Sequence, residues 1–396
     1  MLNCGKTFNL LKNKENTMEK VRIGIVGIGN MGSWHTKFAW ESEFCSLAAV
    51  CDTNPKAFDR VHGPARESTP CFTDYDEFLA KGNAELILIS VPHYDHPDLA
   101  IRAMNAGKHI LVEKPIAVHK AAAQKLLDEG KKHPELVQSA MFCQRAIGAH
   151  QKIKQLIDSG ELGKITRVNW IITDWFRTQH YYNSGDWRAS WRGEGGGVLL
   201  NQCPHQLDMM QWFFGMPNKV RAAVKFGKYH DIEVEDEVNA YLEYEDGKVG
   251  NFIASTGEMP GTNRLEITAE RGRLVYEGGV LTFLRNEVET SVYCRTATNG
   301  FGKAPAWTCQ IPYEKETLPV HQIIMDNVAQ AIRNGTPLIA PMAEGIRGLE
   351  LGNAMLLSGW RDSDITLPMD GEDFENRLNQ LIATSRYQKK SAEKAE

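Results

Sequence analysis

A glycine-rich turn near the start of the chain could bind a phosphate-bearing ligand. Residues 22–26 (RIGIV) have the pattern of a buried strand, and residues 27–32 (GIGNMG) follow directly as G-x-G-x-x-G. In this pattern the first glycine permits a tight turn, the second lets the backbone approach a diphosphate, and the third allows close packing of helix on strand. A turn that binds no ligand is the alternative. The candidate phosphate-binding residues are Gly27, Gly29, Asn30 and Met31.

An acidic residue follows the next predicted strand. Asp52 ends the apolar segment 48–52, 20 residues after Gly32. A carboxylate there can accept hydrogen bonds from the ribose of adenosine and repel a 2′-phosphate, so we expect NAD rather than NADP. No arginine follows immediately, and Lys56 is the nearest cation. Asp52 could also cap a helix that begins near Pro55, and the two roles are compatible.

Aromatic residues are concentrated between residues 175 and 194. Flat rings can stack on the apolar C–H faces of a sugar, while neighbouring Arg, Asn and Gln side chains bind its hydroxyls. We expect about half of these rings, including Trp175 and Trp191, to be core. The middle of the segment contains glycine and serine, so it can form a loop over a cleft. The candidate substrate-binding residues there are Arg177, Tyr182, Trp187 and Arg188.

A second block of polar residues lies within residues 195–208 (GGGVLLNQCPHQLD). Asn201, His205 and Asp208 are separated by four and three positions, so a helix would place them on one face. A core histidine that contacts no substrate is the alternative for His205. A metal site is not expected, because no third ligand stands at short spacing from His205 and Asp208, and His93 with His96 is an unlikely pair of ligands.

Two further motifs suggest a family. Residues 91–96 (VPHYDH) and 107–115 (GKHILVEKP) follow two predicted strands, and the second contains Glu113, Lys114 and Pro115. Together with the upstream glycine motif, they make residues 21 to about 360 resemble the Gfo/Idh/MocA family, which includes glucose-fructose oxidoreductase and inositol dehydrogenase. The resemblance implies an NAD-binding Rossmann domain and a second domain that holds a carbohydrate-like substrate.

The resemblance implies that Lys114 is the catalytic lysine beside the nicotinamide. Oxidation of an alcohol requires loss of the hydroxyl proton, and a partly buried lysine with a lowered pKa can assist. A surface lysine at a strand end is the alternative. We also expect a cis peptide between Lys114 and Pro115. His205 would be either the general base or the group that orients the reacting hydroxyl.

One position departs from the commoner family pattern, which has an aspartate where Asn201 stands. An amide supplies no charge to stabilise a protonated His205, so we favour Lys114 as the proton acceptor. Glu113 could equally be structural. By resemblance, the cofactor-binding set also contains Pro92, His93, His96, Glu113 and Lys114, and the substrate-binding set contains Asn201 and His205.

The alternation of strands and helices predicts an α/β fold with two domains. Short apolar runs and helical segments alternate over 21–141, as in a doubly wound parallel sheet. Residues 219–313 favour a large open, mostly antiparallel sheet in an α+β domain, and two late helices are expected near 320–333 and 343–358. The predicted units are a disordered tail (1–20), an NAD-binding domain (21–143), a substrate-binding domain (144–384) and a polar tail (385–396).

Composition narrows the partners. The formal net charge of -5 is spread along 396 residues, which gives no electrostatic reason for binding nucleic acid or an anionic membrane. No apolar run approaches the roughly 20 residues that span a bilayer, and no C-x-x-C pair occurs, so we expect a soluble cytoplasmic protein. The open sheet could pair with a second copy in a homo-oligomer. Met18 could be the true initiator.

The aromatic segment and the N-Q-x-P-H block most resemble the family branch that oxidises glycosides, including C-glucosides, at the C3 hydroxyl. This implies a dehydrogenase, whose 3-oxo product a separate lyase could then cleave. A redox-neutral NAD-dependent glycosidase, an inositol or free-sugar dehydrogenase, and a cofactor-binding regulator without turnover are the alternatives.

Overall fold

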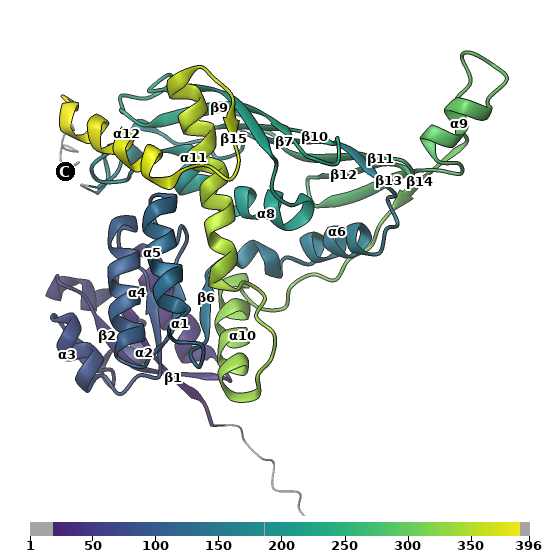
Figure 1. Ribbon diagram of the computed structural model, residues 1–396. Helices are drawn as coiled ribbons and strands as arrows, with labels where there is room; N and C mark the ends of the chain where they lie inside the picture. The colour runs from purple at the N-terminus through teal and green to yellow at the C-terminus, as the bar shows by residue number, and fades with distance from the viewer. Residues whose placement is uncertain (1–18, 186, 389–396) are drawn as a thin grey trace, which may run out of the picture.

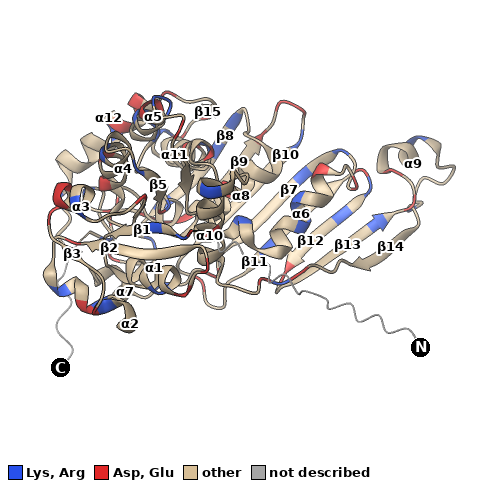
Figure 2. Cartoon of the chain, turned by 90° about the horizontal axis from the view of Figure 1, so that it is seen from below, with Lys and Arg blue, Asp and Glu red and all other residues tan. Residues whose placement is uncertain are grey.

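The computed structural model describes residues 19–185 and 187–388. They form two packed domains, each built from one β-sheet and its helices (Figure 1). The expected tails fall largely on residues 1–18 and 389–396, which lie outside the described residues, as does Met18. Among the described residues, no helix has the length and apolar character needed to cross a membrane. Acidic and basic residues are interspersed along both parts of the fold (Figure 2).

The N-terminal sheet is the expected Rossmann sheet. Its six strands are all parallel and have the order β3-β2-β1-β4-β5-β6, which is the order of dinucleotide-binding folds. The strands are β1 (Val21–Val26), β2 (Cys45–Cys51), β3 (Cys71–Phe72), β4 (Leu86–Ile89), β5 (His109–Val112) and β6 (Gln138–Ala140). All four residues of β4 are buried, as expected for a strand covered on both faces.

Helices cover this sheet on both sides. They are α1 (Asn30–Glu41), η1 (Pro55–Arg60), α2 (Gly63–Arg66), α3 (Tyr75–Lys81), η2 (His93–Asp95), α4 (His96–Asn105) and α5 (Lys120–Gly130). A helix from the end of the chain joins them: α10 (Val320–Asn334) buries Ile324, Met325 and Val328 against residues of β1 and β2. The C-terminal part of the chain therefore completes the N-terminal core.

The second sheet has nine strands in the order β14-β13-β12-β11-β7-β10-β9-β8-β15. Only β7 and β10 pair in parallel, and the remaining pairs are antiparallel, as predicted. The strands are β7 (Ile165–Ile172), β8 (Lys219–Phe226), β9 (Glu235–Glu243), β10 (Val249–Ser255), β11 (Asn263–Ala269), β12 (Gly272–Glu277), β13 (Val280–Asn286), β14 (Ala306–Gln310) and β15 (Ile365–Thr366).

Helices pack on one face of the second sheet and leave the other face open (Figure 1). They and the connecting turns are η3 (Cys143–Ala146), α6 (Gly148–Asp158), α7 (Gln179–Asn183), the π-helical turn η4 (Val198–Gln202), α8 (Pro204–Phe214), η5 (Met342–Glu344), α11 (Gly345–Arg361) and α12 (Gly371–Thr384). Between β13 and β14, α9 (Thr290–Thr296) stands at the end of a projecting arm.

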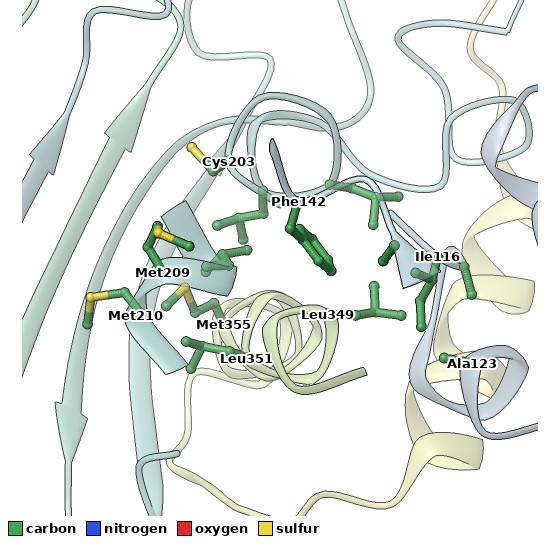
Figure 3. Close-up of a cluster of buried hydrophobic side chains, with 14 of the residues drawn as sticks. Ile116, Ala123, Phe142, Cys203, Met209, Met210, Leu349, Leu351 and Met355 are labelled. Atoms are coloured by element: carbon green, nitrogen blue, oxygen red, sulfur yellow. The ribbon is translucent and has the colours of Figure 1, made fainter. Parts of the chain in front are cut away.

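A continuous apolar core joins the two domains. Figure 3 shows α11 in its centre, with Leu349 and Met355 between Ile116 and Phe142 on one side and Met209 of α8 on the other. Because α11 contacts α5 as well as α8 and β8, the two sheets share one core. This shared core fixes the carboxyl ends of the Rossmann strands against α8 and η4.

Candidate active site

A cleft of about 680 Å³ opens at the carboxyl ends of β1, β4 and β5. The strand order reverses between β1 and β4, which is where ligands bind in open α/β sheets. Of the predicted site residues, the cleft is lined by Gly27, Gly29, Asn30, Met31, Asp52, Pro92, His93, His96, Glu113, Lys114, Trp187, Arg188 and Asn201. Arg177, Tyr182 and His205 are not part of its lining.

The glycine turn is shaped to admit a diphosphate. Gly27 has φ +86°, and a Cβ there would collide with the carbonyl oxygen of Ser90. A Cβ on Gly32 would collide with the carbonyl oxygen of Gly27, so α1 packs closely on the turn. In contrast, no atom lies within 4 Å of a Cβ placed on Gly29. The turn is therefore open on the side where α1 begins, and it fits a dinucleotide.

Asp52 holds the glycine turn against the end of β2. Its Oδ2 accepts a hydrogen bond from Ile28 N at 2.7 Å, and its Oδ1 accepts one from Asn54 N at 2.8 Å. The cap of the following 3-10 helix is Asn54, whose side chain accepts from Lys56 N. The suggested capping role of Asp52 is therefore wrong, and its carboxylate faces the cleft.

The far end of the cleft contains residues that the sequence did not single out. Arg102 lines it beside Tyr75, with the guanidinium 4.9 Å from the ring centroid. Asp76 accepts a hydrogen bond from Arg102 at 2.6 Å, and Asp98 lies 3.5 Å away. Two carboxylates thus neutralise the cation that lines this end. The sequence signal was weak, because an arginine on an amphipathic helix is ordinarily solvent-exposed.

Lys114 follows β5 and reaches across to the second domain. Its Nζ donates to the carbonyl oxygen of Asn201 at 3.0 Å, and the Lys114-Pro115 peptide is cis, as expected. Burial lowers the pKa of Lys114, and the charge of Glu113 opposes this shift. The amine therefore lies between the two domains and loses its proton more readily than an exposed lysine does.

The carboxylate of Glu113 forms its hydrogen bonds within the Rossmann domain. Its carboxylate pairs with His35 of α1 at 2.7 Å and accepts from the backbone N of Lys114 at 3.1 Å. Burial alone would raise the pKa of Glu113, but the hydrogen bond and charge of His35, together with Lys114, lower it to about 2. Glu113 thus provides a fixed negative charge at the cleft. It also links α1 to the end of β5, which is the structural role that the sequence left open.

His93 and His96 connect the loops after β4 and β5. His96 opens α4, and its ring nitrogens lie 2.7 Å from the carbonyl oxygen of Pro115 and 2.8 Å from that of Val91. His93 packs edge-on against Trp187 with 5.2 Å between ring centroids, and its Nδ1 is buried without a protein partner. Among the described residues, no group of three or more His, Cys, Asp and Glu side chains could hold a metal ion.

His205 is the second residue of α8 and lies just beyond the lining of the cleft. Desolvation, with a contribution from the charge of Lys114, lowers the pKa of His205 to about 3. The Nδ1 atom is buried and has no hydrogen-bond partner in the protein. Its imidazole is therefore neutral, electrostatically coupled to Lys114 and left with an unsatisfied nitrogen.

The three polar residues of the second block do not share one face. Residues 198–202 wind as a π-helix, and α8 starts afresh at Pro204, so the spacing between Asn201 and His205 is not that of one regular helix. Asp208 is fully buried and accepts from Nη2 and Nε of Arg145, at 2.6 and 2.8 Å. Asp208 therefore belongs to a buried ion pair, and the single face predicted for the three residues is wrong.

Glu235 holds the π-helical turn in place. Its buried carboxylate accepts from Gly197 N at 2.8 Å and from Leu199 N at 3.0 Å. Burial raises the pKa of Glu235 to about 7. The sequence offered no signal for this residue, because it lies in β9, far along the chain from the turn that it binds.

The aromatic segment divides into a cleft wall and core. Trp187 and Arg188 line the cleft, with the guanidinium 4.3 Å from the Trp187 ring centroid. Tyr182 is only 1% exposed, and its hydroxyl hydrogen-bonds with Thr256 at 2.8 Å, so the expectation that it contacts substrate is wrong. Trp191 is buried, as expected.

Family models match both domains of this chain. Residues 21–141 match the oxidoreductase family with an NAD-binding Rossmann fold, and residues 150–275 match the GFO/IDH/MocA C-terminal domain. The chain belongs to the Gfo/Idh/MocA family. Its N-terminal domain is accordingly an NAD-binding Rossmann domain, as the glycine turn and Asp52 indicated.

Similar members of the Gfo/Idh/MocA family include dehydrogenases of polyols and sugars. Inositol 2-dehydrogenase of Salmonella typhimurium is 30% identical over 154 residues, 38% of this chain and 45% of that protein. Levoglucosan dehydrogenase of Pseudarthrobacter phenanthrenivorans is 24% identical over 294 residues, 65% of this chain and 74% of that protein. The chain spans about half the length of the inositol 2-dehydrogenases that it matches.

Solved structures agree in fold. The WlbA dehydrogenase of Bordetella pertussis in complex with NADH and UDP-GlcNAcA superposes with a TM-score of 0.74 at 26% identity, covering 89% of this chain and 100% of that one. Levoglucosan dehydrogenase in complex with NADH and levoglucosan gives 0.72 at 21% identity, with the same coverage, and supports the fold alone.

The Gfo/Idh/MocA assignment makes Asp52 a test of cofactor choice. We expect Asp52→Asn to weaken NAD binding about tenfold and to narrow the preference for NAD over NADP about hundredfold, because the charge that repels a 2′-phosphate is lost. The amide oxygen can still accept from Ile28 N, so the turn is retained. Isothermal titration with both cofactors measures the effect. Asp59→Asn, exposed on η1, is the matched control, and an unchanged preference in Asp52→Asn would contradict this role.

Proposed function

We propose that this protein is an NAD-dependent dehydrogenase that oxidises a secondary hydroxyl, at C3, of a sugar or glycoside to a ketone. The observation that carries the proposal is the amine of Lys114, which lies at the cofactor cleft and contacts Asn201 of the second domain at 3.0 Å. In this proposal Lys114 accepts the hydroxyl proton and His205 orients the hydroxyl.

The electrostatics support this division of roles. A lowered pKa increases the fraction of Lys114 that is a neutral amine, and one N–H bound to Asn201 leaves the lone pair free to accept a proton. His205, with a pKa of about 3, is a much weaker base than Lys114, so we assign it the orienting role and not that of proton acceptor. When bound, NAD supplies the hydride acceptor.

The part of the cleft that the second domain lines supports a carbohydrate substrate. Trp187 offers a flat apolar surface, Arg188 offers N–H donors for hydroxyl oxygens, and the side-chain oxygen of Asn201 can accept from a hydroxyl. The similar inositol and levoglucosan dehydrogenases act on hydroxylated rings. The choice of C3 and of glycosides rests on the family branch that the aromatic segment resembles. A C3 ketone acidifies the C2 proton, so a separate lyase could then expel the C1 substituent.

A panel experiment tests the proposal. The protein is incubated with NAD and with inositols, free hexoses, O-glucosides and C-glucosides, while NADH absorbance and product mass are followed. We expect NADH with a glucoside and a product two hydrogens lighter. NADH only with inositols or free sugars would restrict the activity to polyols. Aglycone release without net NADH would favour the redox-neutral glycosidase, and no turnover would leave a regulator.

The pH dependence of sugar oxidation follows from the two pKa shifts. We expect kcat/KM to rise with pH as Lys114 deprotonates and to level off below the ordinary lysine pKa of about 10.4, because burial lowers the pKa of Lys114. His205 stays neutral, so no limb is expected near the ordinary histidine value of about 6.5. Initial rates of NADH formation over a pH series measure this profile. A limb near that value that disappears in His205→Asn would contradict these roles.

A further inference from the structure

Tyr181 binds the residues of the substrate wall without lining the cleft itself. Its phenol oxygen lies 2.5 Å from Arg188 Nη1, 3.1 Å from Gln202 Nε2 and 3.3 Å from Asn201 Nδ2. Arg188 and Asn201 both line the cleft. The oxygen therefore joins two loops, one after α7 and one in η4, at the point where both face the cleft.

The ring of Tyr181 lies in the middle of a stack of alternating rings and guanidinium groups. Arg188 lies 4.3 Å from the ring centroids of both Tyr181 and Trp187, and Arg177 lies 5.0 Å from Tyr181 and 5.3 Å from Trp175. Contacts of this kind are attractive, and they strengthen where water is excluded. The faces of Arg188 are used within the stack, so it is a support for the cleft wall rather than a platform for ligand.

Asn201 connects this stack to the amine of Lys114. Its side-chain N–H groups reach both Tyr181 and the buried carboxylate of Glu194, and the other Glu194 oxygen accepts from Ala189 N at 2.8 Å. The backbone carbonyl of Asn201 accepts from Lys114 Nζ. Loss of the Tyr181 oxygen should therefore shift the side chains of Arg188 and Asn201, and also the turn η4 whose backbone contacts the amine of Lys114.

We propose that Tyr181 is the positioning residue of the substrate wall, holding Arg188 and Asn201 in the orientation that binds sugar hydroxyls. This inference rests on the proposed function and deepens it. A phenol oxygen has two acceptor sites and one proton to donate. Removing it leaves the Arg188 and Asn201 donors without their shared acceptor, so they turn toward other partners and lose their orientation for the ligand. Phenylalanine keeps the stacked ring and removes only the oxygen.

The chain offers a matched control in the adjacent residue. We expect Tyr181→Phe to raise KM for the sugar about tenfold, a typical effect of losing hydrogen bonds to a charged group, with the dissociation constant of NAD unchanged and kcat within about threefold. Tyr182→Phe loses a buried hydrogen bond to Thr256, so it should lower the melting temperature and leave KM unchanged. A fall in kcat with a shifted pH profile in Tyr181→Phe would overturn the positioning role.

A second measurement separates this inference from the proposed function. Hydrogen exchange in the NAD-bound protein should become faster over residues 187–201 in Tyr181→Phe and not in Tyr182→Phe. Wild-type KM and wild-type exchange in Tyr181→Phe would overturn the inference even if the wild type oxidises a glucoside. If no sugar in the panel is oxidised, the proposed function fails, and the exchange difference still decides whether Tyr181 positions this wall.

Discussion

Replacing Lys114 by methionine is expected to lower kcat for NAD reduction about 10³-fold, within the range attributed to a positioned proton acceptor. Methionine has a similar length but no basic nitrogen, so the hydroxyl proton loses its acceptor near the Asn201 carbonyl. The glycine turn and Asp52 are unchanged in this variant, so the affinity for NAD should change far less than kcat. Steady-state kinetics and cofactor titration measure the two quantities separately.

A second substitution distinguishes proton acceptance from positive charge. Arginine retains the cation but does not deprotonate in proteins, so Lys114→Arg should be about as inactive as Lys114→Met. Lys131→Met, exposed at the end of α5, is the control for loss of a lysine. If Lys114→Arg were nearly as active as the wild type, the lysine would contribute charge and not take the proton.

The parts of the site that the sequence predicted are those encoded locally. The glycine turn depends on residues adjacent in the chain, and its position between a strand and a helix follows from hydrophobic period. The same holds for Asp52, which lies at the end of the next strand, and for the cis peptide beside Lys114. Short-range signals of this kind also predicted that the strands of the first sheet pair in parallel and that those of the second sheet pair mainly antiparallel.

The parts that the sequence missed depend on contacts between distant segments. The choice between Tyr181 and Tyr182 shows this: successive helical residues differ by about 100° in direction, and only the packing of α7 on Thr256 decides which ring points inward. Glu235, from β9, holds η4 through contacts with Gly197 and Leu199 that no local pattern encodes. The common face predicted for Asn201, His205 and Asp208 failed because the π-helical turn that contains Asn201 ends before α8 begins.

The buried cation that binds Asp208 has the largest expected effect on stability. Arg145 is 1% exposed and lies between the carboxylates of Asp208 on α8 and Glu344 in η5. Its guanidinium also lies 5.4 Å from the Trp212 ring centroid. Burial raises the pKa of Asp208 even though Arg145 opposes the shift, so this carboxylate depends on its cation. The network therefore joins the end of the Rossmann domain to the helix that carries His205.

We expect Arg145→Leu to lower the free energy of unfolding by about 3–5 kcal/mol, because one buried charge is left without its partner. Urea unfolding followed by tryptophan fluorescence measures the change. Lys81→Met, which removes an exposed ion pair with Glu77, should cost less than about 1 kcal/mol. Adding Asp208→Leu to Arg145→Leu should recover part of the loss, since the unpaired carboxylate is then removed as well. An Arg145→Leu protein as stable as the wild type would contradict this prediction. It would mean that the attraction between Arg145 and Asp208 only balances the cost of burying their charges. Apolar packing against α11 would then be enough to hold α8, and with it His205, in place.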